Sequence, residues 1–103
     1  MKYVLAWTTR SSGSAAENEA AEVRILEVFS KWAPGPDITI HQFVQRLDGQ
    51  GGFAVVEGDN PAAILKDVVI FTPFNEYTLY PVIDIAEGAQ IIREAVEFRA
   101  SIK

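Results

Sequence analysis

The sequence predicts an α+β fold, because two helix-start signals and one hairpin signal separate its runs of strand-forming residues. The helix starts are Ser14-Ala15-Ala16-Glu17 and Asn60-Pro61, and the hairpin signal is Asp48-Gly49-Gln50-Gly51-Gly52. In chain order these signals predict strand, helix, strand, strand, helix and strand, followed by a C-terminal helix. That order in 103 residues is typical of a ferredoxin-like βαββαβ sandwich with an antiparallel sheet. We expect a single domain over residues 1–103.

The first strand is predicted over residues 2–8 and the first helix from Ser14 onward. Both alternating sets of side chains in residues 2–8 are apolar, which is typical of a central strand covered on both faces. Ser14 and Glu17 form a capping box at the start of the helix, and Pro34-Gly35-Pro36 ends it because proline lacks a donor N–H. The apolar residues that recur at helical spacing between these ends are Ala21, Ile25, Val28, Phe29 and Trp32.

A hairpin is predicted from residues 38–47 and 53–57, joined by the glycine-rich loop. Both sides of the first arm carry apolar and polar groups, so the pattern alone leaves its orientation open. If Leu47 pairs with Phe53, then Phe43 lies opposite Glu57 and shares its face of the sheet. A one-residue bulge would reverse this conclusion, because it turns the following side chains to the other face.

A second helix is predicted to begin at Asn60, whose side chain caps it, and to hold Pro61 in its first turn. It ends before Pro73. The residues of this helix that we expect to face the sheet are Ile64, Leu65 and Val68.

The last strand is predicted over residues 76–83, and a C-terminal helix follows it. Pro81 has no N–H for the hydrogen-bond ladder, so it favours an edge position for this strand. Asp84 and Glu87 repeat the capping pattern at the start of the helix. The helix is amphipathic, with apolar residues at Ile91, Ile92, Ala95, Phe98 and Ile102.

Charge and composition exclude several classes of function. The net charge of −5, with nine scattered basic residues, argues against nucleic-acid binding, which needs clustered lysine and arginine. The absence of cysteine removes disulfides, thiolate catalysis, zinc ribbons and iron–sulfur clusters. It is compatible with a reducing cytoplasm, where we expect the protein. No apolar run approaches the roughly 20 residues that span a bilayer, so we expect no membrane partner.

The hydrophobic fraction of 49% is high for a small sheet covered on one side only. We therefore expect a homodimer in which a second copy covers the other face. One sheet of this size buries on the order of 1,500 Å² in such a contact, which is a standard specific interface.

Four segments of the chain are familiar in their residues and spacing. They are Met1-Lys2-Tyr3-Val4 with Trp7-Thr8, Ile40-His41-Gln42-Phe43-Val44, Asp48-Gly49 with Gly52-Phe53-Ala54-Val55-Val56-Glu57, and Pro81-Val82-Ile83-Asp84-Ile85-Ala86-Glu87. The chain resembles, over nearly its whole length, the bacterial family called domain of unknown function 3303. This resemblance implies a dimeric α/β barrel, in which two ferredoxin-like sheets pack face to face. The family has no established activity, so the resemblance assigns no catalytic residue. The fold expected for the chain also resembles, in topology alone, that of antibiotic-biosynthesis monooxygenases and haem-degrading proteins.

The candidate site residues come from all four predicted strands. His41, the only histidine, has the chemistry of a proton shuttle or an axial ligand, and the alternative is a histidine satisfied by one hydrogen bond. Glu57 is the last residue of an apolar strand, where burial would favour its protonated form and fit it for acid–base catalysis. The alternative is a carboxylate at the end of the strand that is exposed to solvent. Trp7, Phe43 and Tyr80 complete the predicted ligand-binding set, with plain core or interface positions as the alternative for the large aromatic residues.

The sequence favours a homodimer that binds a small, mainly apolar molecule in a pocket beside the sheet. The alternatives are a cofactor-independent enzyme resembling a monooxygenase or isomerase, with His41 or Glu57 as base and Trp7 shaping the pocket, and a subunit that serves only for association. We expect no metal and no cofactor, and no motif names a substrate.

Overall fold

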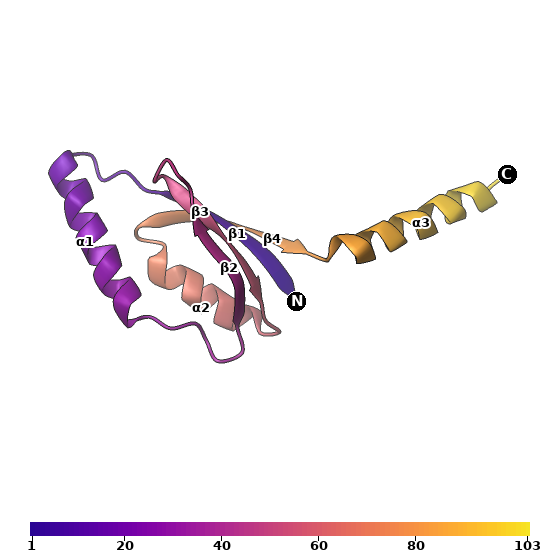
Figure 1. Ribbon diagram of the computed structural model, residues 1–103, viewed down its shortest axis with the longest axis horizontal. Helices are drawn as coiled ribbons and strands as arrows, with labels where there is room; N and C mark the ends of the chain where they lie inside the picture. Colours follow the sequence, from indigo (N-terminus) through magenta and orange to yellow (C-terminus); the bar gives the residue numbers. More distant parts are fainter.

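The computed structural model describes residues 1–103, and it contains the predicted elements in the predicted order (Figure 1). Their bounds are β1 Lys2–Thr9, α1 Ala15–Lys31, β2 Thr39–Gln45, β3 Gly51–Glu57, α2 Pro61–Phe71, β4 Asn75–Val82 and α3 Ile85–Ser101. The four strands form one antiparallel sheet in the order β2-β3-β1-β4. The chain therefore has an α+β fold of the ferredoxin-like type. β1 is central, as its apolar pattern predicts, and β4 with Pro81 is an edge strand.

The starts of α1 and α2 follow from local hydrogen bonds that the sequence predicts. The Ser14 hydroxyl accepts the N–H of Glu17 at 3.1 Å, and the Asn60 side chain accepts the N–H of Ala62 at 3.0 Å. Each bond satisfies a backbone donor that the first helical turn leaves free.

The start of α3 differs from the prediction. Asp84 occupies the cap position but makes no side-chain cap bond. Its carboxylate instead accepts a hydrogen bond from Lys2 Nζ at 2.7 Å, on the neighbouring end of β1. The ammonium group is a stronger partner for the carboxylate than a backbone N–H of the helix, because both the ammonium and the carboxylate carry a charge. This pair raises the pKa of Lys2 and lowers the pKa of Asp84.

The core lies on the side of the sheet that faces α2. Leu5, Ala54 and Val56 of the sheet pack with Val68 of the helix. Leu65 was predicted to join them, but it is 61% exposed. The buried positions of α2 are Ile64, Val68 and Phe71, which are spaced by four and three residues, so a residue one step further along is turned away by about 100°.

The register of the β2–β3 hairpin corrects the prediction for Phe43. Val44, not Leu47, pairs with Phe53, and a bulge at His41 shifts the register between Ile40 and Gln42. Phe43 therefore pairs with Ala54 on the core side of the sheet, whereas Glu57 points to the other side. The expectation that Phe43 and Glu57 share a face is wrong, because the pairing is shifted from the expected register by three residues, and an odd shift turns each side chain to the other face.

The side of the sheet away from the core is here called the open face, because no helix of the chain covers it. Its side chains include Val4, Val44, Phe53, Glu57 and Tyr80, as the pairing register requires. α3 also lies apart from the rest of the molecule, extending beyond the end of the sheet (Figure 1). The radius of gyration is 18.4 Å, compared with about 13 Å for a compact domain of this length. No helix has the length and apolar character needed to cross a membrane.

Candidate functional site

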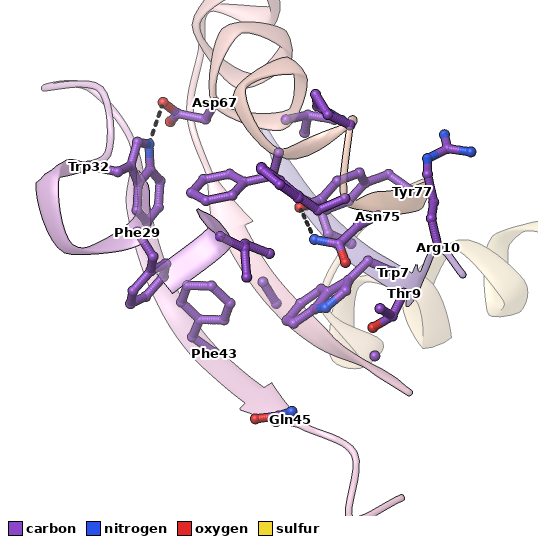
Figure 2. A pocket seen from close by; sticks show the side chains of 18 of the residues that line it. Trp7, Thr9, Arg10, Phe29, Trp32, Phe43, Gln45, Asp67, Asn75 and Tyr77 are labelled. Atoms are coloured by element: carbon purple, nitrogen blue, oxygen red, sulfur yellow. Dashed lines mark hydrogen bonds between the residues drawn. The ribbon is translucent and has the colours of Figure 1, made fainter. Parts of the chain in front are cut away.

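A cavity of about 810 Å³ lies between α1, α2 and the core side of the sheet. It exists because α1 stands away from the sheet and buries none of its residues fully. The floor of the cavity comes from β1, β2 and β3, including Leu5, Ala54 and Val56. Figure 2 shows the cavity from close by, with side chains from both helices and the sheet directed into it.

One end of the cavity is aromatic. Phe29 and Trp32, at the end of α1, meet Phe43 of β2 and Phe71 of α2. The rings of Phe29 and Phe43 are 5.9 Å apart, and those of Trp32 and Phe71 are 5.4 Å apart at 87°. Trp7 extends the cluster along the floor, with its ring 5.5 Å from Phe43 at 82°. Such edge-to-face contacts are favourable beyond the area that they bury.

Asp67 of α2 holds this aromatic end in place. One carboxylate oxygen accepts the Trp32 indole N–H at 3.2 Å, as Figure 2 shows, and the other accepts the N–H of Gly35 at 3.2 Å. These two bonds join the end of α1 and the following loop to α2. The orientation of Trp32 is therefore set by a polar contact as well as by packing.

The other end of the cavity carries polar groups. Asn75, which is 5% exposed, donates from Nδ2 to the Tyr77 hydroxyl at 3.3 Å (Figure 2). Burial raises the pKa of Tyr77, so its phenol stays neutral at physiological pH and keeps a proton to donate. Arg10 lies at the rim, where its guanidinium pairs with Glu76 at 3.2 Å and donates to the Thr72 carbonyl at 2.9 Å. Its charge is thus already compensated.

The open face carries a separate polar cluster near the start of β1. His41 Nε2 and Glu57 Oε1 are 2.8 Å apart, and both side chains are half-exposed. The bulge turns His41 to this side of the sheet. The Lys2–Asp84 pair lies beside them, because Lys2 is the cross-strand neighbour of Glu57. No group of three or more histidine, aspartate or glutamate side chains has the arrangement of metal ligands.

The sequence profile of one family, described as domain of unknown function (DUF3303), matches residues 1–96. The chain belongs to the DUF3303 family. The match includes the whole sheet, both helices beside the cavity and most of α3. Among curated proteins, none matches the chain.

The structure divides the predicted site residues of this DUF3303 chain between two sides of the sheet. Trp7 and Phe43 line the cavity on the core side. His41, Glu57 and Tyr80 lie on the open face. His41 and Glu57 meet each other on the open face, and Phe43 and Trp7 do not join them.

Four further cavity residues were not among the predicted site residues. Phe29 and Trp32 appear in the sequence only as members of the apolar stripe of α1, and that pattern is the signal that could have identified them. Tyr77 stands on the same alternating set of β4 as Leu79, which marks it as facing the core. Phe71 gives no such signal, because the end of α2 meets the end of α1 only in the folded chain.

Proposed function

We propose that this protein binds a small, mainly apolar molecule in the cavity between α1, α2 and the sheet. The cavity volume of about 810 Å³ falls within the range of roughly 300–1,000 Å³ that is usual for small-molecule sites. Its lining is mainly apolar, and its polar side chains include Arg10, Asn75 and Tyr77. The observation that carries the proposal is the convergence of aromatic rings from three strands and both neighbouring helices, namely Trp7, Phe29, Trp32, Phe43, Phe71 and Tyr77.

The two ends of the cavity favour a ligand with two chemical parts. A ring or a chain of rings would stack among Phe29, Trp32 and Phe43, because aromatic faces and edges attract one another. A carbonyl or hydroxyl group would lie near Tyr77 and Asn75, where a neutral phenol can donate a hydrogen bond. Arg10 is paired with Glu76, so a ligand without a full negative charge fits better than an anion.

We further propose that the protein works as a homodimer through the open face, in the cytoplasm. Val44, Phe53 and Tyr80 on this face are each about half-exposed and have no cover within the chain. A second copy placed on the open face would remove this apolar surface from water.

A second candidate function is acid–base catalysis by His41 and Glu57. The 2.8 Å contact between the imidazole and the carboxylate favours it, because a histidine base is commonly oriented by such a partner. Trp7 faces the cavity on the other side of the sheet, so it does not shape this site. A second copy on the open face would enclose the pair. A third candidate is a subunit with no small ligand, which serves only for association.

Thermal-shift and calorimetric screening of aromatic and polyketide-like compounds tests the binding function. Phe43→Ala and Phe53→Ala form a matched pair, since each residue is 46% exposed and the two side chains lie on opposite faces of the sheet. We expect Phe43→Ala to weaken binding of the compound found by about tenfold or more, from lost apolar contact, and Phe53→Ala to leave it unchanged. A screen without any bound compound, or equal effects of both substitutions, would contradict the proposal.

The same compounds separate binding from catalysis. If turnover is found, His41→Ala and Glu57→Gln should lower it by about 10²–10⁴-fold while the fold remains intact. Turnover that survives both substitutions would remove the acid–base candidate. A bound compound that is recovered unchanged supports a binding protein.

A further inference from the structure

α3 has one apolar side that nothing in its own chain covers. At 100° per residue, Arg93, Glu94 and Glu97 fall on the side opposite to the large apolar residues. Glu87 lies at the border beside Phe98, and Arg99 lies within the apolar side. The uncovered apolar residues are Ile85, Ile91, Ile92, Val96, Phe98 and Ile102. Ile92 is 64% exposed and Phe98 is 68% exposed. An amphipathic pattern of this kind is typical of a helix that packs against another surface.

The connection before α3 directs it away from its own sheet. Only Ile83 and Asp84 separate β4 from α3, and Asp84 has an extended backbone with φ −64° and ψ 146°. The Lys2 ammonium holds the Asp84 carboxylate at 2.7 Å, which fixes this corner to β1. As Figure 1 shows, the helix then extends beyond the end of the sheet.

The exposed area indicates how much surface lacks a partner. The chain exposes 7678 Å², whereas a compact protein of the same mass exposes about 5,800 Å². The excess is about 1,900 Å² per chain. Part of this excess lines the cavity, so twice its value, about 3,800 Å², is the upper limit of the area that a pair buries. This limit falls within the range of roughly 2,000–5,000 Å² that obligate homodimers bury.

We propose that α3 is an arm that packs its apolar side against a second copy of this chain. The arm starts at the edge strand β4, beside the open face, so a copy seated on that face lies within reach of a helix of about 25 Å. In a twofold dimer the contact is reciprocal, so each chain gives an arm and receives one. A single second copy would thus cover both the open face of the sheet and the apolar side of α3. The arm deepens the homodimer proposed above and is independent of the small ligand.

Sedimentation velocity of the full chain at micromolar concentration tests the arm. The variant Ile92→Glu/Phe98→Glu places two charges on the apolar side of α3, and the control Gln90→Glu/Ser101→Glu places the same two charges on its polar side. We expect a dimer for the wild type and the control, and a monomer for Ile92→Glu/Phe98→Glu. A monomeric wild type, or an Ile92→Glu/Phe98→Glu variant that stays as dimeric as the control, would overturn the proposal.

Two further measurements keep the result interpretable. Near-ultraviolet circular dichroism of Trp7 and Trp32 reports whether the cavity is still folded in each variant. If the charged variant loses this signal, Ile92→Ala/Phe98→Ala replaces it, and we expect its dimer dissociation constant to rise by about 100-fold or more. A constant equal to that of the wild type contradicts the arm. Ligand binding is measured separately, and its absence would leave the sedimentation result unaffected.

Discussion

The Tyr77 hydroxyl makes stability depend on pH in a defined direction. Burial raises its pKa above the usual value near 10, so the unfolded chain loses this proton at a lower pH than the folded one. The stabilisation from keeping the phenol neutral is complete below about pH 10 and declines as the pH rises toward the folded value. Denaturant unfolding from pH 8 to 11 should therefore show a steeper loss of stability in the wild type than in Tyr77→Phe. Parallel curves would show that Tyr77 is not desolvated.

The pairing of His41 with Glu57 illustrates how one residue can change the assignment of a site. Both residues were predicted as site candidates from the sequence, and they lie in contact. The bulge turns His41 toward Glu57, whereas Phe43 pairs with Ala54 and faces the core side of the sheet. The predicted set of five residues therefore divides into a cavity pair, Trp7 and Phe43, and an open-face group.

α1 forms the outer wall of the cavity, and its first turn depends on Ser14. Ser14→Ala removes the oxygen that accepts the Glu17 N–H, and we expect a loss of about 1 kcal/mol in the free energy of unfolding. Ser11→Ala, which removes no side-chain bond, is the control for denaturant unfolding. Ligand binding should be little changed. A loss of binding at unchanged stability would instead place Ser14 in a binding site for an anion.

β3 passes close to β1 and β2 at Gly52, which leaves no room for a side chain. A Cβ atom there would meet the Trp7 ring and the Val44 carbonyl oxygen. We expect Gly52→Ala to lower the free energy of unfolding by roughly 3 kcal/mol and to change the tryptophan fluorescence, because the floor of the cavity must shift.

Gly49→Ala is the matched control in the same hairpin. Gly49 has φ +73° but no atom within 4 Å of its added Cβ, so only the backbone strain of about 1 kcal/mol applies. A Gly52→Ala variant as stable as Gly49→Ala would show that the strands are not packed this closely.

The molecule as a whole has two uncovered apolar surfaces, the open face of the sheet and the apolar side of α3. Both arise from the same order of elements, since α1 and α2 lie on one side of the sheet and α3 follows an edge strand. The cavity lies on the other side of the sheet from the open face, so the proposed binding of a ligand and the proposed association of two chains would use different surfaces. Each can be changed by substitution without directly touching the other.

Local signals in the amino-acid sequence were enough to predict the elements and their order. Helix caps at Ser14 and Asn60, the proline at position 61 and the hairpin glycines act over a few neighbouring residues, so they can be read without knowing the fold. The apolar pattern of β1 and Pro81 of β4 likewise predicted a central strand and an edge strand. Trp7 and Phe43, which were predicted as ligand-binding residues, line the cavity.

The site and the position of α3 depend on contacts between residues far apart in the chain. The bulge at His41 is one extra residue in a ladder of hydrogen bonds, and no local preference marks where the pairing shifts. Phe29, Trp32 and Phe71 come together only because the end of α1 meets the end of α2. Asp84 has the residue type of a helix cap, but Lys2, 82 positions earlier in the chain, offers its carboxylate a charged partner and so sets the corner from which α3 leaves the sheet.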